Sequence, residues 1–257
     1  MKELIISEWE RAWGRKKTQM LLIVYPVLVF LMEVFMLQFG VGFYDMEHEV
    51  ALHALNFPLF SLRDLSLLLV FVIAPMLWVD SFSGEYSTGA YRMVLIRPYS
   101  KGKLLAAKWV SQAALTGILL LIPFVMSQIV GWINLPNPSV TTFFYEGAER
   151  YDMGEALLYQ LCFYGWIFLI LLVCQSVCAL LGTWMPNPIL SFLAYAGGLI
   201  GSIYLSDSFI ILFGHTDEVF RLMAGKAEVS VYYVLFGTLV VSLVSIYGSW
   251  KKKDWVK

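Results

Sequence analysis

Long apolar runs separated by short polar segments dominate this chain, and they predict membrane-spanning helices rather than a water-soluble core. A helix needs about 20 apolar residues to cross roughly 30 Å of hydrocarbon. The runs predict six spans, at residues 20–39, 62–80, 104–133, 156–184, 188–206 and 230–250. We therefore expect an all-α polytopic membrane protein.

Residues 156–206 contain no Asp, Glu, Lys, Arg or His, so charge alone does not divide this stretch into spans. As one helix this stretch would be more than twice as long as the membrane is thick. Pro186 and Pro188 lack a backbone donor and disfavour helix before them, which predicts a tight inner turn. Residues 209–213 form an apolar patch too short to span, and we expect it to dip into the outer leaflet.

The composition fits one membrane domain over residues 1–257, since 59% of the residues are hydrophobic, 14% are charged and the mean hydropathy is +0.71. Little chain is left for a separate catalytic domain. The sequence has no P-loop, no HExxH, no GxSxG and no metal-spaced Cys/His cluster. Its three histidines lie in predicted outer loops, and Cys162, Cys174 and Cys178 lie in one apolar run that suits packing. We expect no enzymatic activity, metal or cofactor in this chain.

Basic residues are distributed unevenly across the predicted spans. Of 18 Lys and Arg, four fall outside, namely Arg63, Arg150, Arg221 and Lys226, and the other 14 fall inside. By the positive-inside rule both termini lie in the cytoplasm of a multi-pass protein of the cell membrane. The first apolar run is longer than a signal peptide core and is interpreted as a retained anchor.

Residues 1–19 predict an amphipathic helix on the inner leaflet. Leu4, Ile5, Trp9 and Trp13 share one side, with Glu8, Arg11 and Arg15 elsewhere around the helix and Lys16 and Lys17 after it. Tryptophans at helical spacing suit the headgroup region. The alternative is a flexible basic tail.

Residues 80–108 form a polar, basic segment between the second and third spans. A short helix over 90–96 is expected to end near Arg97, because Pro98 disfavours helix before it, and Ser100 is the expected N-cap of the third span. Residues 84–103 are interpreted as a surface that fits a groove on a cytoplasmic partner, the alternative being a loop that rests on headgroups. Its candidate contact residues are Glu85, Gly89, Tyr91, Arg92, Met93, Arg97, Pro98 and Lys101.

Intramembrane polar and small residues give further candidates. Glu33 lies within the first span, where a carboxyl is costly; it either lines a polar cavity or is protonated or snorkelling. Asp64, Asp80 and Asp207 are expected as solvated span ends. Small residues four apart in the fifth span allow close helix packing, either within one bundle or at a homodimer seam, and they include Ala194, Gly197, Gly198 and Gly201.

The order of these features resembles the permease subunits of type-2 ATP-binding-cassette (ABC-2) exporters. The similarity covers the whole chain: an interfacial elbow helix, six spans and, after the second span, Glu85, Gly89, the apolar stretch 91–96, Pro98 and a series of lysines that ends at Lys108. No single residue of this motif is specific to the family, and the resemblance comes from the order of the residues and their position between the second and third spans.

The resemblance implies a coupling helix within 84–103 that docks on a separate ATPase, present in two copies, which binds the ATP and Mg. It also implies a second permease, identical or related, that meets this chain through the first and fifth spans, so that Glu33, Ala194, Gly197, Gly198 and Gly201 lie at the dimer seam or translocation path. An apolar, aromatic seam suits amphipathic substrates such as peptides, antibiotics or lipids. No nucleic acid is expected as a partner.

Two other functions stay open. One is a structural or sensory membrane protein that binds a non-ATPase partner through the inner loop. The other is a secondary transporter, for which internal repeats and paired ionisable residues would be expected but are not found. Under the exporter hypothesis, reversing the charge of Glu85 is expected to leave the chain folded and inserted while weakening its contact with the ATPase.

Overall fold

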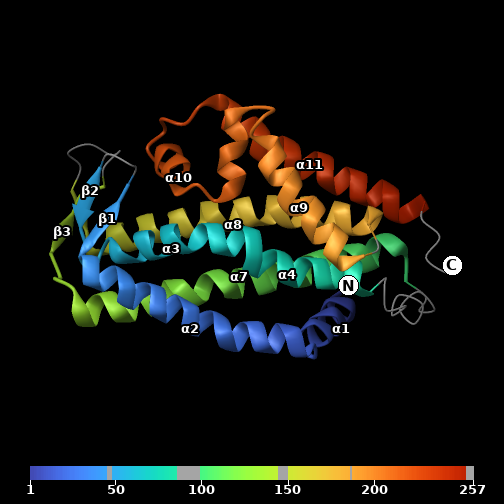
Figure 1. Cartoon of the computed structure of the whole chain (residues 1–257), viewed down its shortest axis with the longest axis horizontal. Coiled ribbons are helices and arrows are strands. Elements are labelled where there is room, and N and C mark those ends of the chain that lie inside the picture. Colours follow the sequence, from blue (N-terminus) through green and yellow to red (C-terminus); the bar gives the residue numbers. More distant parts are fainter. Residues whose placement is uncertain (45–47, 86–98, 144–149, 186, 253–257) are drawn as a thin grey trace.

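The computed structural model describes residues 1–44, 48–85, 99–143, 150–185 and 187–252. In this part of the chain five helical segments lie along the long axis of the molecule (Figure 1), and each is long and apolar enough to cross a membrane. They are α2 (Lys16–Phe39), the continuous run Phe57–Gly84, α7 (Lys101–Asn134), α8 (Met153–Trp184) and α11 (Val229–Lys252). The chain is therefore an all-α multi-pass membrane protein.

The predicted fifth span is shorter than expected. Instead of running to residue 206, α9 (Pro188–Ser202) ends after 15 residues, or about 22 Å. It begins where the prolines predicted a break, and the Asn187 side chain caps it by accepting a hydrogen bond from the Ile189 backbone N–H at 2.9 Å. The 3-10 helix η4 (Asp207–Phe213) and α10 (Thr216–Met223) then return the chain to α11.

The second long segment is one helix interrupted by two π turns. It consists of α3 (Phe57–Leu68), η1 (Leu69–Ile73), α4 (Ala74–Val79) and η2 (Asp80–Gly84), of which η1 and η2 are π-helical. The first π turn lies just before Pro75, which cannot donate a backbone hydrogen bond. There the Val70 carbonyl accepts a hydrogen bond from the Tyr195 hydroxyl at 3.1 Å, which ties α9 to this segment.

The core lies where this segment packs against α7 and α8. Trp78 donates its indole N–H to the Thr116 hydroxyl at 3.0 Å, so its buried polar group is satisfied. Gly182 of α8 permits close packing, because an added Cβ would lie 3.1 Å from the Phe82 side chain. Cys174 and Cys178 are fully buried free thiols, as expected for packing residues, whereas Cys162 of the same apolar run is exposed.

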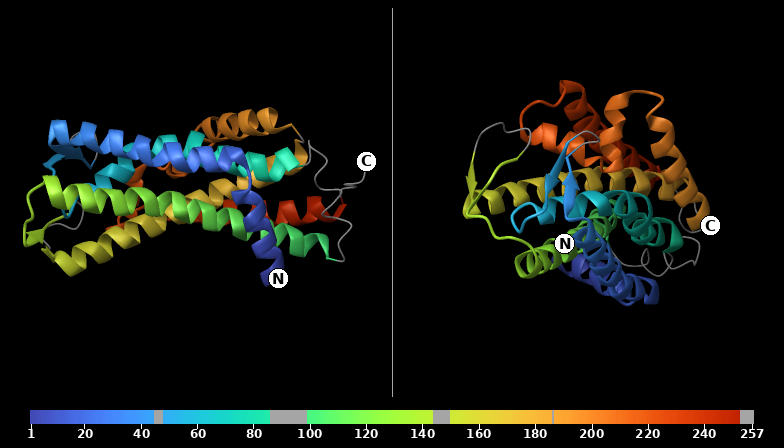
Figure 2. Two further views of the ribbon diagram at one scale, coloured as in Figure 1. Left: turned by 90° about the horizontal axis from the view of Figure 1, so that it is seen from below. Right: turned by 60° about the vertical axis from the view of Figure 1, so that its left-hand side comes forward.

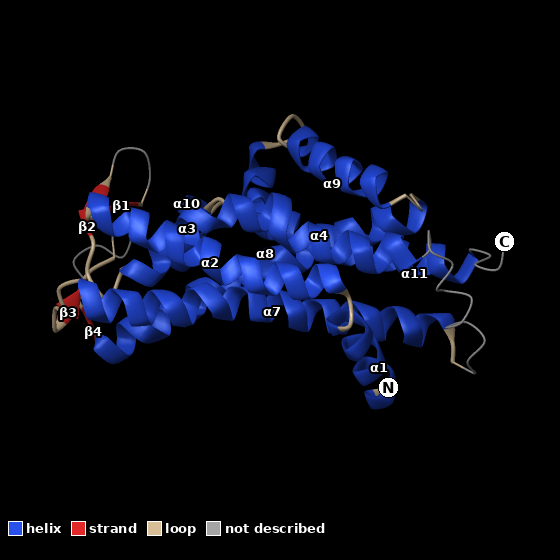
Figure 3. Cartoon of the chain, turned by 60° about the horizontal axis from the view of Figure 1, so that its bottom comes forward, coloured by secondary structure: helices blue, strands red, loops and turns tan. Residues whose placement is uncertain are grey.

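The two ends of the bundle differ in structure. Two antiparallel strand pairs lie together at one end (Figure 3), namely β1 (Val41–Phe43) with β2 (Glu49–Ala51), and β3 (Val140–Thr141) with β4 (Tyr151–Asp152). At the other end are the first helix, α1 (Lys2–Trp13), the start of α7 and the end of α11. Figure 2 shows α1 turning away from α2 and crossing the bundle. We call the end of the bundle that contains α1, the start of α7 and the end of α11 the inner end, after the orientation that the charges predict.

Candidate functional site

Helix α1 is fixed to the bundle by a face that includes a buried carboxylate. Leu4, Glu8 and Ala12 recur every fourth residue and are buried, and α1 packs against α7. The sequence pattern had placed Glu8 away from the packing face, and this prediction is wrong: the residue is 5% exposed. The error arises because the amphipathic pattern treats every charge as solvated, whereas a charge can be buried against a partner.

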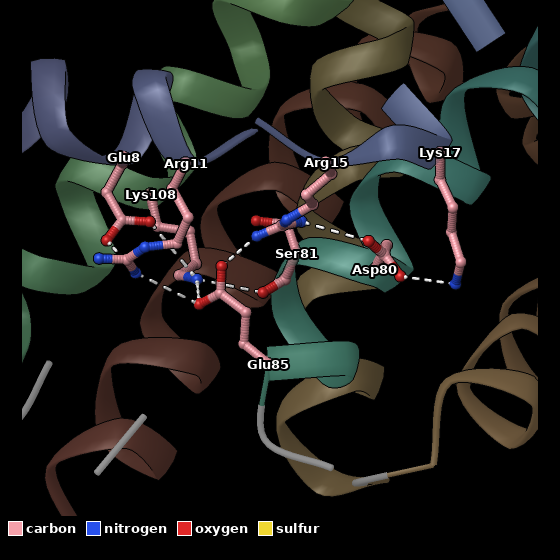
Figure 4. Close-up of polar contacts among 8 residues, drawn as sticks. All are labelled: Glu8, Arg11, Arg15, Lys17, Asp80, Ser81, Glu85 and Lys108. Carbon is pink, nitrogen blue, oxygen red and sulfur yellow. Dashed lines mark hydrogen bonds and ion pairs between the residues drawn. The ribbon is translucent and has the colours of Figure 1, made fainter. Parts of the chain in front are cut away.

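The partner is Lys108, which projects from α7 into the gap between α1 and the second span (Figure 4). Its side chain is 3% exposed. The ammonium donates a short hydrogen bond to Glu85 Oε2, another to the Ser81 carbonyl at 3.1 Å, and lies 3.5 Å from Glu8 Oε2. One lysine therefore joins three helical elements.

Three further cations surround the carboxylates. Arg15 donates a short hydrogen bond to Glu85 Oε1 and lies 3.5 Å from Asp80 Oδ2. Arg11 lies 3.6 Å from Glu85 Oε2 and also pairs with Glu8. Lys17 pairs with Asp80 at 3.0 Å, although its own side chain is 78% exposed. Together these residues form what we call the charge cluster: Glu8, Arg11, Arg15, Lys17, Asp80, Glu85 and Lys108.

The charges of the cluster nearly balance. Three carboxylates meet four cations, so the formal net charge is +1. Burial of a single ion would cost several kcal/mol, and only close pairing with additional hydrogen bonds offsets that cost. Removal of one partner is correspondingly expensive, at about 3–5 kcal/mol for a fully buried pair. The cluster therefore holds α1, the end of the second span and the start of α7 in one fixed arrangement.

Comparison with protein families gives one assignment. A family model described as "Protein of unknown function (DUF2705)" matches residues 21–256. The chain belongs to this family. No curated protein matches the chain. In this DUF2705 member the matched region contains Asp80, Glu85 and Lys108 of the charge cluster, whereas the four cluster residues of α1 and the start of α2 precede it.

The cluster includes some of the residues that the sequence singled out. Glu85, Arg15 and Lys17 belong to it. Lys16 is exposed as the first residue of α2, and Lys101 is half-buried as the first residue of α7. Ser100 accepts a hydrogen bond from the Lys103 backbone N–H at 3.4 Å, which confirms it as the N-cap of α7. The other predicted coupling residues lie outside the described residues: Gly89, Tyr91, Arg92, Met93, Arg97 and Pro98.

Four members of the cluster were missed as site residues: Glu8, Arg11, Asp80 and Lys108. Asp80 was expected to be solvated but is paired with Arg15 and Lys17. The sequence feature that indicated a buried ion pair is Lys108, which lies more than one turn inside the predicted span 104–133. An ionisable residue at such depth requires a named partner, and Glu85 at the end of the preceding span was the obvious one.

The predicted interfacial tryptophans flank the packed face of α1. Their rings lie 5.7 Å apart, and Trp13 is exposed. The predicted interfacial segment, residues 1–19, is in fact divided: α1 ends at Trp13, and Lys16 already belongs to α2. Aromatic rings beside exposed lysines remain suited to the headgroup region.

A second polar group lies deep in the predicted membrane region. Glu33 is fully buried and accepts a hydrogen bond from the Ser61 hydroxyl at 3.1 Å, while its Oε2 has no hydrogen-bond partner among the described residues. Nearby, the Tyr164 hydroxyl donates to the Pro58 carbonyl at 3.0 Å. Glu33 is thus covered by its own chain, so it could face a second copy only if α2 separated from α3.

The small-residue face of α9 is open in the single chain. Gly197, Gly198 and Gly201 are exposed, and a Cβ added to any of them would meet nothing within 4 Å. Ala194 is half-buried beside them. In this chain the glycines therefore leave space that no described element fills.

Proposed function

We propose that this DUF2705 member is the membrane-spanning subunit of an ATP-driven exporter. It forms the translocation path, and it couples through residues 84–103 to a separate cytoplasmic ATPase that binds the ATP and Mg. Its substrates are amphipathic molecules such as peptides, antibiotics or lipids. The chain lies in the cell membrane with both termini in the cytoplasm and works beside a second permease.

The observation that carries this proposal is the position of the charge cluster. Glu85 lies at the start of residues 84–103, and Lys108 lies in the first turns of α7, just after this segment. Lys108 pairs with Glu85 and also with Glu8 of α1. The two flanks of the inner segment and the elbow helix are therefore joined at one point.

Such a joint suits the transmission of force. A partner that pushed on residues 84–103 would move the end of the second span, the start of α7 and α1 together, because separating them breaks buried ion pairs. A solvated loop with independent flanks would absorb the same push locally. In bistable packed structures, small shifts at one site are converted into larger rearrangements of whole helices.

The predicted dimer seam fits the same proposal. The glycine face of α9 is open, and helix association in lipid depends on close packing rather than on a hydrophobic driving force. Glu33 would join the path only in a state in which α2 has moved away from Ser61.

The decisive experiment begins with the partner. The full chain is co-expressed with the protein from a neighbouring reading frame that contains GxxxxGK[ST] and no spans, and the two are tested for co-purification and for ATP hydrolysis in liposomes. We expect a stable complex whose ATPase activity depends on the membrane subunit. Absence of such a partner, or a complex without ATP hydrolysis, would favour the sensory or structural alternative.

The coupling surface needs substitutions that spare the cluster. Glu85 is unsuitable, since reversal of its charge would place a cation among Lys108, Arg11 and Arg15. Contrary to the sequence-based expectation, such a variant should therefore be destabilised. Tyr91→Ala with Met93→Ala is the better test, with Lys2→Ala as a matched control on the same side. We expect the double variant to lose ATPase binding at unchanged thermal stability, and normal binding would contradict the coupling role.

A further inference from the structure

A groove of about 230 Å³ runs between α7 and α11 near the inner end of the bundle. Leu105, Ala106 and Val110 line one wall, and Leu243 and Tyr247 line the other. The two helices meet closely at its inner end, where a Cβ added to Gly102 would lie 2.9 Å from the Tyr247 ring. The groove is thus apolar along its length and closed by a glycine–tyrosine contact.

Four lysines lie at the inner ends of the two helices that form this groove. Lys101 and Lys103 flank Gly102 at the start of α7, and Lys251 and Lys252 lie one turn beyond Tyr247 at the end of α11. Lys103, Lys251 and Lys252 are exposed. Residues 101–112 and 241–252, which form these parts of the two helices, contain no Asp or Glu. The described parts of these two helices therefore contribute lysines but no acidic side chains to this region.

The two helix ends differ in how they tolerate this charge. Lysines at the end of α11 interact favourably with the helix dipole, but Lys101 and Lys103 lie at the positive end of α7, whose first turn has no acidic residue. An anion at this position would be favoured by the lysines and by the dipole together.

We propose that this groove binds an anionic phospholipid of the inner leaflet. One acyl chain lies between Ala106 and Leu243, and the phosphate lies among Lys101, Lys103, Lys251 and Lys252. Charge complementarity identifies the occupant: a zwitterionic lipid brings its own ammonium and gains less from four lysines than an anionic lipid does. Basic pockets between spans on the inner side have the general form of anionic-lipid sites.

The structure supplies its own comparison groove. A second apolar groove of about 300 Å³ lies between α7 and α8, lined by Gly117, Leu121, Gly165 and neighbouring apolar residues. Residues 109–133 and 156–184, which contain its lining, include no Lys or Arg, whereas lysines lie at the inner end of the α7–α11 groove. It can accommodate hydrocarbon without any preference for a headgroup. The proposal therefore predicts anionic selectivity at the α7–α11 groove and none at the α7–α8 groove.

Native mass spectrometry of the full-length protein, titrated with phosphatidylglycerol or phosphatidylcholine of equal chain length, tests the site. We expect one phosphatidylglycerol to be retained at least fivefold more tightly than phosphatidylcholine. Lys251→Gln with Lys252→Gln should weaken phosphatidylglycerol binding about tenfold, since half of the basic groups are lost. These two lysines lie outside the predicted coupling segment, and no ATPase is needed, so the result is independent of the proposed transport function.

Two controls separate a site from general attraction to basic residues. Lys2→Gln with Lys16→Gln removes the same charge from the same side of the membrane and should change binding less than twofold. Ala106→Phe fills the groove but keeps all four lysines, and it should weaken binding, whereas Gly165→Phe in the comparison groove should not.

Four results would overturn the proposal. Equal retention of the two lipids would show that the site has no preference for an anionic headgroup. An equal effect of the two lysine pairs would show that Lys251 and Lys252 do not form the site. Undiminished binding by Ala106→Phe would show that the lipid does not occupy the groove. Glycerol phosphate, which lacks acyl chains, should fail to compete at concentrations at which the lipid saturates. Successful competition would assign the lysines to free phosphate and would equally refute a lipid site.

Discussion

Substitution of Lys108 by Met tests whether the charge cluster holds the inner end of the bundle together. Methionine keeps most of the side-chain volume but removes the ammonium that pairs with Glu85, Glu8 and the Ser81 carbonyl. Loss of one partner from a buried ion pair costs about 3–5 kcal/mol. Arg15 and Arg11 still neutralise part of the remaining charge. We therefore expect the lower end of that range, about 3 kcal/mol.

The matched control is Lys17→Met, which removes a lysine from the exposed edge of the same cluster. Lys17 is 78% exposed and pairs only with Asp80 among the ion pairs described above. An exposed pair of this kind contributes about 0–1 kcal/mol. The two variants remove the same chemical group, so a difference between them isolates the effect of burial.

Thermal unfolding can be followed with a thiol-reactive dye, because Cys174 and Cys178 are buried and react only when the bundle opens, while exposed Cys162 gives a constant background. A loss of about 3 kcal/mol corresponds to a decrease in Tm of roughly 6–12 °C for a domain of this size. Lys17→Met should shift Tm by less than about 4 °C, as the contribution of an exposed pair implies.

A double variant tests whether Lys108 and Glu85 stabilise the protein as a pair. When Glu85→Met is combined with Lys108→Met, the uncompensated carboxylate is gone, and the loss should be smaller than the sum of the two single losses by about 1–3 kcal/mol. Additive losses would mean that the two groups act independently. A Lys108→Met protein as stable as the parent would show that the cluster does not stabilise the inner end.

Three other predictions concern topology, assembly and pH. An impermeant maleimide added to intact cells should label Ser139→Cys but not Ser100→Cys, and the reverse pattern would refute the predicted orientation. Gly198→Leu should leave the stability of the single chain nearly unchanged, because nothing lies within 4 Å of the added Cβ; it should reduce dimerisation in light scattering, and an unchanged dimer would place the seam elsewhere. Burial lowers the pKa of His53 below its usual value near 6.5, so the unfolded chain binds the proton first as pH falls. Thermal stability should therefore decrease below about pH 6.5 in the parent, and His53→Gln should lose this part of the dependence; an equal pH dependence in both proteins would exclude His53 as its source.

The sequence by itself determined the class of protein and most of its helices. Hydrophobic runs and two prolines located the long helices to within a few residues, because a bilayer accepts only segments that satisfy their own backbone hydrogen bonds. The end of α9 was less predictable. Residues 203–206 are neutral and continue the apolar pattern, yet α9 ends at Ser202, and the η4 turn that follows packs against α8 and α11.

The tertiary structure decided which charges meet. The sequence pattern assigned Glu8 and Asp80 to solvent, since an amphipathic pattern cannot tell a solvated charge from one buried against a distant partner. Lys108 lies 100 residues from Glu8 in the chain, yet their charged groups are 3.5 Å apart. That distance depends on where α1 crosses α7, which is set by packing between elements and not by local propensity. The identity of the charged residues was thus available from the sequence, whereas their assembly into one buried cluster required the fold.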